Sequence, residues 1–260
     1  LRPFESQWRI FILHDAERMN ISAQNHFLKT LEEPPGRSLF ILLSEHPRVL
    51  LPTIRSRCQA VRFRALRRET VSELLRRGRD LPADLADSIA EIAEGQMSRA
   101  IDLVDSEKRQ VALSLVERLA SGDDPVEMAE EFSEFLDQQR KQIEAAVKAE
   151  AANDAMDEQS RGDAESAKEE RLALMAATVR RDIVEYLYLM QTWYRDVLVA
   201  GSTGGAGAIW NRDKKAELGR SGGGDAGAKI AAIEQARVDL DRFIPEERVF
   251  RELFFALAAK

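Results

Sequence analysis

Arg57 has the side chain best suited to bind a phosphate group. It stands in the tripeptide Ser56-Arg57-Cys58, inside the stretch Leu-Pro-Thr-Ile-Arg-Ser-Arg-Cys-Gln. A guanidinium group is planar and permanently charged, and it can donate two parallel hydrogen bonds to one phosphate or carboxylate. Arg57 is also suited to cap a helix or to pair with a carboxylate such as Glu45. The residue types therefore predict an anion contact at Arg57 and leave open which anion it is.

Cys58 is the single cysteine of the chain. No base accompanies it to activate a thiolate, so we expect it to be packed as a small hydrophobic residue. One cysteine forms no intramolecular disulfide and no four-cysteine zinc site. The three histidines, His14, His26 and His46, show no metal-ligand spacing with one another or with Cys58. We therefore predict no metal site within these residues.

Asp15 follows an apolar run at residues 9–14. In nucleotide-binding α/β folds, ligands bind at the carboxyl edge of the sheet, so a carboxylate there faces bound Mg²⁺ and phosphates. An Asp after a strand is also a common turn residue or helix cap. The next residue, Ala16, lacks the carboxylate that usually orients the attacking water in an active ATPase. Asp15 is thus a candidate nucleotide-proximal residue in a chain whose own hydrolysis we expect to be impaired.

The chain contains no phosphate-binding loop of the pattern Gly-x-x-x-x-Gly-Lys-Ser/Thr. A glycine-rich stretch at 201–227 lacks both the Lys-Ser/Thr pair and the preceding strand that such a loop requires. We therefore expect these residues to bind no ATP in the usual way.

The elements that must position Arg57 and Asp15 form a strand, helix, strand unit. Apolar runs at 9–14 and 38–44 predict two buried strands of a parallel sheet. Helical spacing over 20–33, stopped by two prolines, predicts the helix between them. A short helix at 49–56 and a third strand at 59–63 follow. Three strands are too few for a complete sheet of this type, so we predict that residues 1–65 are the second half of an α/β domain.

Residues beyond 65 have only helical patterns. Three short helices predict an all-α lid at 66–106, and longer amphipathic segments predict an all-α collar or oligomerisation domain at 107–260. Two interruptions lie in that domain. Residues 150–170 have almost no large apolar side chains, which indicates a solvated helix extension or a disordered loop. Residues 201–227 contain repeated glycines, which predict a flexible segment.

Composition narrows the class of protein. The 260 residues carry 38 Lys+Arg and 45 Asp+Glu, a net charge of −7, which argues against a strongly basic protein that binds nucleic acid by itself. No run reaches the roughly 18–20 apolar residues of a membrane span. The opening has no Met and no export signal, so we expect a cytoplasmic protein whose sequence here begins part-way along the chain.

Two stretches together resemble a known family. Leu-Lys-Thr-Leu-Glu-Glu-Pro-Pro at 28–35 and Ser-Arg-Cys at 56–58 resemble the clamp-loader branch of AAA+ proteins, in particular the delta-prime type of bacterial DNA polymerase III. The resemblance is strongest over 8–64. It extends to residues 95–100, which resemble the start of the sensor-2 helix in the lid. It also extends to Trp193-Tyr194-Arg195-Asp196, which resembles a segment of the collar.

The resemblance implies roles for individual residues. Arg57 becomes an arginine finger offered in trans to a nucleotide on a neighbouring subunit, and Ser44 matches the sensor-1 position. Arg99 matches sensor 2 with a shift, because hydrolysing tau/gamma relatives place the arginine where Ser98 stands here. One residue along a helix turns a side chain by about 100°. Together with Asp15, Ser44 and Arg99 are therefore nucleotide-proximal candidates in a degenerate site.

The resemblance also implies a function. The chain would be the stator of a clamp loader in DNA replication, without independent catalytic activity. Its partners would be tau/gamma and delta subunits, the sliding clamp and, through the complex, primer–template DNA. ATP and Mg²⁺ would be bound by the neighbouring subunit, and zinc is an option only for a segment that precedes this sequence.

Alternatives remain open on the sequence alone. A tau/gamma-type ATPase motor is one, although Ala16 argues against it; a purely structural helical scaffold is another. The apolar stripes that include Ile183 and Phe250 could form either the chain's own core or the packing between subunits. A set of arginines could contact DNA or simply be solvated: Arg64, Arg67, Arg68, Arg76, Arg77 and Arg79.

Overall fold

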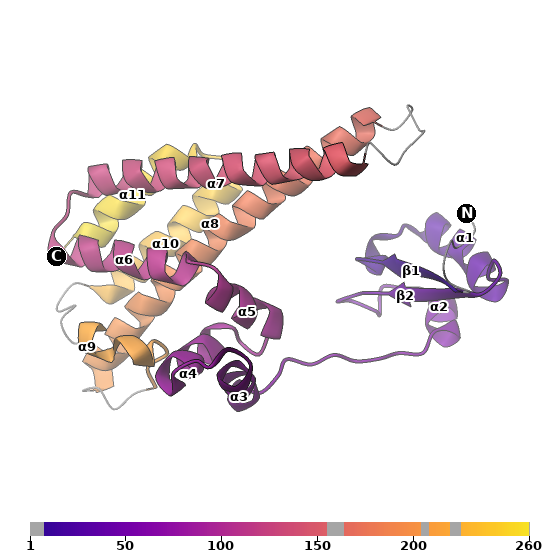
Figure 1. The fold of residues 1–260 in the computed structure, drawn as a ribbon, viewed down its shortest axis with the longest axis horizontal. Coiled ribbons are helices and arrows are strands. Elements are labelled where there is room, and N and C mark those ends of the chain that lie inside the picture. Colours follow the sequence, from indigo (N-terminus) through magenta and orange to yellow (C-terminus); the bar gives the residue numbers. More distant parts are fainter. Residues whose placement is uncertain (1–7, 155–163, 204–207, 219–224, 260) are drawn as a thin grey trace. The chain divides into compact units, whose positions relative to one another are not determined.

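The computed structural model describes residues 8–154, 164–203, 208–218 and 225–259, and the side chains of 146–154 and 164–174 lie outside the description. The chain divides into two compact units, Leu1–Arg64 and Ala65–Lys260 (Figure 1). Within the described residues, the first unit holds a two-stranded sheet and the second is built from helices.

The first unit is the predicted strand, helix, strand arrangement. Its elements are β1 (Arg9–Leu13), η1 (Ala16–Arg18), α1 (Ile21–Glu32), β2 (Ser38–Leu42) and α2 (Pro52–Arg57). The strands pair in parallel, with Arg9 opposite Ser38 and Leu13 opposite Leu42. The Asn20 side chain caps α1 by accepting a hydrogen bond from the Ala23 N–H at 2.8 Å, so local sequence signals fix where this helix begins.

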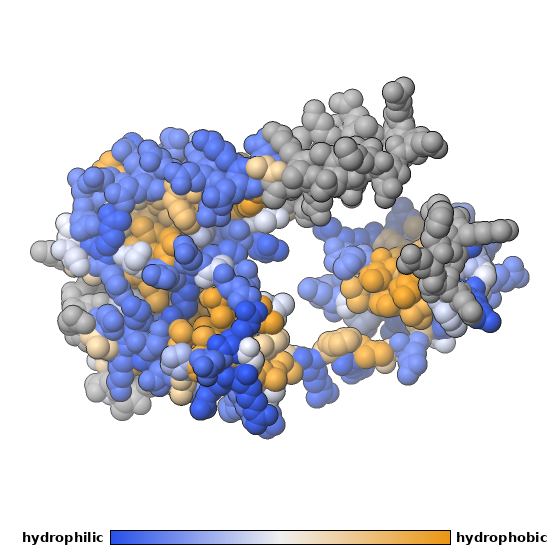
Figure 2. Space-filling view, viewed as in Figure 1, coloured by the Kyte–Doolittle hydropathy of each residue, from blue (hydrophilic) through white to orange (hydrophobic). Residues whose placement is uncertain are grey.

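The two faces of the sheet differ. On one face Phe11 stacks on Phe40, and Phe27 of α1 packs edge-on against Phe40. The opposite face, which carries Ile10 and Ile41, is exposed, and Figure 2 shows hydrophobic residues gathered on this unit. Parallel sheets are normally covered on both faces, so this face is open to a further layer.

The predicted third strand at 59–63 is wrong. These residues have no regular secondary structure and pair with neither β1 nor β2. Val61 and Phe63 are 69% and 91% exposed. Their β-forming side chains do not suffice, because a strand is stabilised by a partner ladder and by packing that this segment lacks.

The second unit contains two groups of helices. Short helices come first: α3 (Arg68–Arg79), α4 (Ala83–Ile92) and α5 (Met97–Asp105). Longer or later ones follow: α6 (Lys108–Ser121), α7 (Pro125–Asp154), α8 (Ala164–Thr203), η2 (Arg212–Lys214), α9 (Lys215–Leu218), α10 (Ala226–Asp241) and α11 (Glu246–Ala258). Figure 1 shows α7 and α11 side by side and α8 along α10 and α6, as their contacts also require.

The core of this unit contains the residues of the predicted apolar stripes. Phe132 of α7 packs against Phe250 and Phe254 of α11 and against Tyr186 of α8, with ring centroids 5.0–5.8 Å apart. The stripe residues are buried in this chain, with Val197 partly so: Ile183, Leu187, Met190, Phe250, Leu253, Phe254 and Leu257. They form an intramolecular core, which is one of the two alternatives left open by the sequence.

Of the two alternatives predicted for 150–170, the helix extension is confirmed in the described residues. Residues 150–154 continue α7 and residues from 164 onward begin α8, while 155–163 lie outside the described residues. The flexible segment predicted for 201–227 is wrong for 208–218, which is folded, with Ile209, Asn211 and Leu218 buried. Most glycines of this stretch lie outside the described residues, within 204–207 and 219–224.

Candidate functional site

Arg57 is the last residue of α2 and its side chain is 40% exposed. One guanidinium nitrogen donates to the Glu32 carboxylate of α1 at 2.5 Å, and another donates to the Thr53 carbonyl oxygen at 3.2 Å. The anion that pairs with Arg57 inside the chain is therefore Glu32, and the alternative of Glu45 is wrong. A guanidinium has five N–H donors, so three remain free of a partner among the described residues.

Gln24 of α1 fixes the start of α2, and the sequence analysis missed it. Its side-chain oxygen accepts a hydrogen bond from the Leu51 N–H at 2.8 Å, and its amide nitrogen donates to the Met19 carbonyl at 2.9 Å. Gln24 is 3% exposed, which is rare for a side-chain amide. The only signal in the sequence was that its helical position places a polar residue on the inward face of α1. Ile54, fully buried, anchors the middle of α2.

The edge of the sheet brings Asp15, Glu17 and Ser44 into one region. Asp15 is exposed, adopts a left-handed backbone with φ 47°, and lies 3.8 Å from Arg18, as expected of a turn residue. Glu17 accepts a hydrogen bond from the Glu45 N–H at 3.2 Å. The nearby Ser44 hydroxyl, followed by backbone N–H groups, lowers the pKa of Glu17 below its ordinary value. Glu17, which the sequence analysis did not select, therefore fixes the loop after β2.

Ala16 occupies the position directly after Asp15, where the sequence lacks a carboxylate. Its side chain is 1% exposed, and its N–H donates to the Leu43 carbonyl at 2.9 Å, which extends the pairing of the strands. A Glu side chain in that position would be directed into the packed interior. Cys58 is half-buried, and burial raises the pKa of its thiol, so the thiolate needed for nucleophilic chemistry is disfavoured.

Arg99 belongs to the second unit, where α8 engages it. Its guanidinium donates to the Glu185 carboxylate at 2.9 and 3.1 Å and lies over the Tyr188 ring, 4.3 Å from the centroid. Tyr188 in turn donates to Glu94 at 2.9 Å. These contacts tie the start of α5 to α8, and the predicted nucleotide-proximal role of Arg99 remains a prediction.

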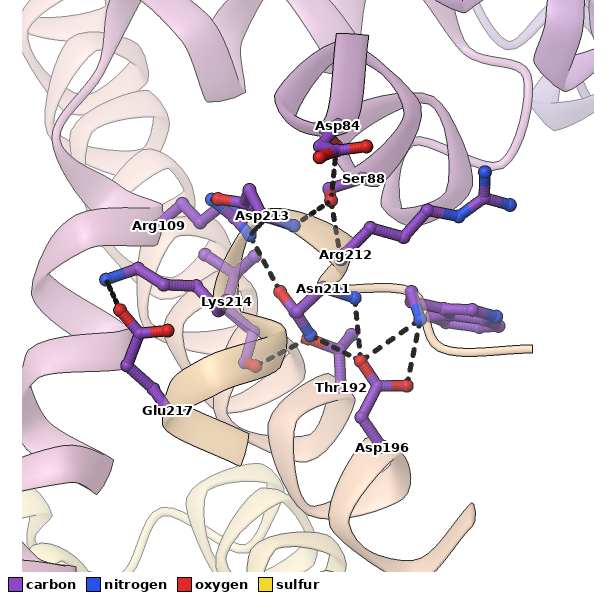
Figure 3. Close-up of polar contacts among 12 residues, drawn as sticks. Asp84, Ser88, Arg109, Thr192, Asp196, Asn211, Arg212, Asp213, Lys214 and Glu217 are labelled. Atoms are coloured by element: carbon purple, nitrogen blue, oxygen red, sulfur yellow. Dashed lines mark hydrogen bonds and ion pairs between the residues drawn. The ribbon is translucent and has the colours of Figure 1, made fainter. Parts of the chain in front are cut away.

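A second polar cluster surrounds residues 208–214, which we call the strap (Figure 3). The fully buried Asp196 carboxylate accepts hydrogen bonds from the Trp210 N–H at 3.0 Å and from the Asn211 N–H at 2.7 Å. It also pairs with Arg195 at 2.6 Å. Asp196 lies seven residues after the buried Leu189, so a charge in an apolar helical register was the signal that could have identified it.

The strap also contacts α6 and α4. Arg109 of α6 donates to the Asp213 carboxylate at 2.7 and 2.9 Å and to the Asn211 side chain at 2.9 Å. On the other side, the Ser88 hydroxyl of α4 accepts from the Arg212 N–H at 2.9 Å. Figure 3 shows Ser88, Arg109 and Asp196 directed toward the strap. The strap thus joins α4 to α6 and α8.

The arginines considered for DNA contact are engaged in part with acidic side chains. Arg68 pairs with Glu91 at 2.6 Å, and Arg79 makes two hydrogen bonds with Asp105.

Within the described residues, no group of three or more His, Cys, Asp or Glu side chains could hold a metal ion. None of the described helices is both long and apolar enough to cross a membrane.

The comparison with known families finds a match in the first unit. Residues 1–67 match a family described as "DNA polymerase III, delta subunit". Over these residues the chain is therefore similar to a subunit of DNA polymerase III.

Individual relatives include two kinds of DNA polymerase III subunit. The chain is 50% identical over 50 residues to DNA polymerase III subunit delta' of Pseudomonas aeruginosa, covering 19% of this chain and 15% of the relative. It is 31% identical over 115 residues to subunit delta' of Bacillus subtilis, covering 42% and 34%. It is also 40% identical over 75 residues to subunit gamma/tau of Mycobacterium tuberculosis, covering 29% and 13%. The chain thus spans about a third or less of the length of these relatives.

Proposed function

We propose that this chain acts as the stator subunit of a bacterial clamp loader and offers Arg57 to the ATP site of a neighbouring tau/gamma subunit. The observation that carries this proposal is the exposed guanidinium at the end of α2, with donors left for a further anion. An arginine supplied in trans stabilises the charge that develops on a transferring phosphoryl group. The similarity to delta' and gamma/tau subunits supports this role.

ATP and Mg²⁺ belong to the neighbouring subunit in this proposal. The sequence has no phosphate-binding loop, and the buried Ala16 stands where a hydrolysing subunit would need a carboxylate. What this chain supplies is a permanent positive charge, and it has no catalytic activity of its own. Asp15 and Ser44 then belong to a degenerate nucleotide edge of the sheet.

The remaining partners follow from the same proposal. Tau/gamma and delta subunits would contact the chain, and the assembled loader would engage the sliding clamp and primer–template DNA in the cytoplasm. Residues 66–106 would serve as the lid and 107–260 as the collar.

The test is ATP hydrolysis by a reconstituted clamp loader that contains this chain, measured with clamp and primed DNA. Arg57→Ala is expected to reduce hydrolysis at the adjoining site by about 10³-fold or more, with assembly intact. Arg55→Ala is the matched control, because Arg55 is an exposed arginine in the same last turn of α2. Single-site analysis is required, because a multi-site ring retains hydrolysis elsewhere.

The outcomes separate the possible roles. Loss with Arg57→Ala and little change with Arg55→Ala would support the arginine finger. Unchanged hydrolysis and clamp loading in both variants would overturn it and leave a scaffold.

A gamma/tau-type ATPase motor is a second candidate, favoured by the 40% identity to the mycobacterial gamma/tau subunit. Nucleotide binding by the full chain distinguishes the two. Tight ATP binding with hydrolysis by the isolated protein would favour the motor, whereas the stator is expected to hydrolyse no ATP alone.

A further inference from the structure

Glu32 links the two sequence stretches that characterise the first unit. It is the last residue of α1, in the stretch with two glutamates and two prolines, and its carboxylate accepts from Arg57, the last residue of α2. The two residues are 25 positions apart in the sequence. Their contact is therefore made by the fold, at the point where the ends of two helices meet.

The position of Glu32 is unfavourable for its own helix. The C-terminal end of a helix carries partial negative charge, so a carboxylate in the last turn of α1 is repelled by it. Arg57 stabilises its own helix, because a cation interacts favourably with the negative C-terminal end of α2. Its guanidinium also donates a hydrogen bond to the Thr53 carbonyl in that last turn. The favourable interaction of Glu32 therefore comes from Arg57 across the interface between the helices.

This ion pair contributes little to stability. The Arg57 and Glu32 side chains are 40% and 50% exposed, and ion pairs this accessible to water contribute almost nothing measurable to folding. The pair does restrict the flexible Arg57 side chain at two of its five donors, on one carboxylate and one carbonyl oxygen. The remaining donors are left to a further anion.

We propose that Glu32 is a positioning residue for Arg57: it holds the guanidinium in the orientation in which its free N–H groups meet a phosphoryl group. This inference rests on the proposed function. A guanidinium that is already oriented loses less side-chain freedom when it binds phosphate, so the contact strengthens in the reacting complex.

The test compares Glu32→Ala, Glu32→Gln and Glu33→Gln in the reconstituted loader. Glu33 is the matched control, because it is the adjacent exposed carboxylate and makes no contact with Arg57 among the described residues. We expect Glu32→Ala to lower kcat of clamp- and DNA-dependent hydrolysis about three- to tenfold, with KM for ATP and assembly unchanged. Glu32→Gln retains an acceptor of the same length and is expected to recover part of that loss, while Glu33→Gln is expected to have no effect.

A second readout does not depend on catalysis. The side-chain Nε–H of Arg57, observed by NMR in the isolated protein, is expected to become more mobile in Glu32→Ala and to stay as in the wild type in Glu33→Gln. Arg57 that is equally mobile in all variants would overturn the positioning role. Faster hydrolysis in Glu32→Ala would also overturn it, because Glu32 would then be withholding Arg57. If Arg57→Ala itself has no effect on hydrolysis, the proposed function fails, and the NMR result still reports on the pair.

Discussion

The Asp196 carboxylate receives both the backbone N–H and the side-chain amide of Asn211, at 2.7 and 2.9 Å. Both residues are fully buried. Asp196 of α8 thereby supplies hydrogen bonds that water would otherwise make to Asn211, 15 residues further along the chain. Asn211 belongs to the strap, which also contacts α4 through Ser88.

Asp196→Ala is expected to destabilise the second unit by about 3 kcal/mol or more, because the buried N–H groups of Trp210 and Asn211 lose their acceptor. Asp225→Ala is the matched control: Asp225 only caps α10, by accepting from Ala228 at 3.0 Å, and should lose about 1 kcal/mol. Urea denaturation of both variants measures the difference. Equal losses would show that the Asp196 network has no special weight.

Ser88→Ala is expected to loosen α4 locally. The Ser88 hydroxyl donates to the Asp84 carbonyl at 2.7 Å and accepts from the Arg212 N–H, so its removal weakens the link between α4 and the strap. The ion pairs of Arg212 with Asp87 and Glu91 and the contacts of Asp196 remain. Hydrogen–deuterium exchange should rise in α4 and stay unchanged in α8 and α11. Ser114→Ala, which removes only a bond to its own helix, is the control. A uniform rise across the unit would contradict a local link.

Gly95→Ala is expected to be strongly destabilising. Gly95 has φ +81°, and a Cβ there would lie 2.3 Å from the Leu66 carbonyl oxygen, which is backbone and cannot move aside easily. Strain of this kind costs about 1–3 kcal/mol before the clash is counted. Gly78→Ala should have the opposite sign, a gain of about 0.5–1 kcal/mol, because Gly78 is helical with open space around its Cα. Thermal denaturation measures both, and a stable Gly95→Ala protein would be inconsistent with this packing.

Alkaline pH is expected to weaken the second unit. Burial, followed by nearby carboxylates, raises the pKa of Tyr186 and Tyr188 to about 12. The unfolded chain loses these protons near pH 10, so the free energy of unfolding should fall as pH rises from about 10 to 12, by at most about 1.4 kcal/mol per pH unit for each tyrosine. Urea denaturation at a series of pH values tests this. Tyr188→Phe should reduce the slope; an unchanged slope would exclude Tyr188 as a cause.

Local signals were enough to predict most helices and both strands. Asn20 and two prolines bound α1. The helical patterns predicted beyond residue 65 correspond to α3 to α8, α10 and α11, whereas α9 lies in the stretch predicted to be flexible. The predicted strand at 59–63 failed because strand formation depends on a partner, which is not encoded in the segment itself. The glycine-rich stretch failed for a related reason: residues 208–218 fold only because Arg109, Asp196 and Ser88 hold them from other helices.

The sequence by itself indicated the similarity to DNA polymerase III subunits and singled out Arg57 as a candidate, because residue types and short motifs can be recognised without the fold. Only the tertiary structure decided which groups meet Arg57 and Asp196. Glu32 and Asn211 lie 25 and 15 residues from their partners, and no local pattern reports a contact over such distances. The tertiary structure also decided burial. Gln24 and Asp196 are residue types that are usually exposed, and the packing around them supplies hydrogen bonds that water would otherwise make.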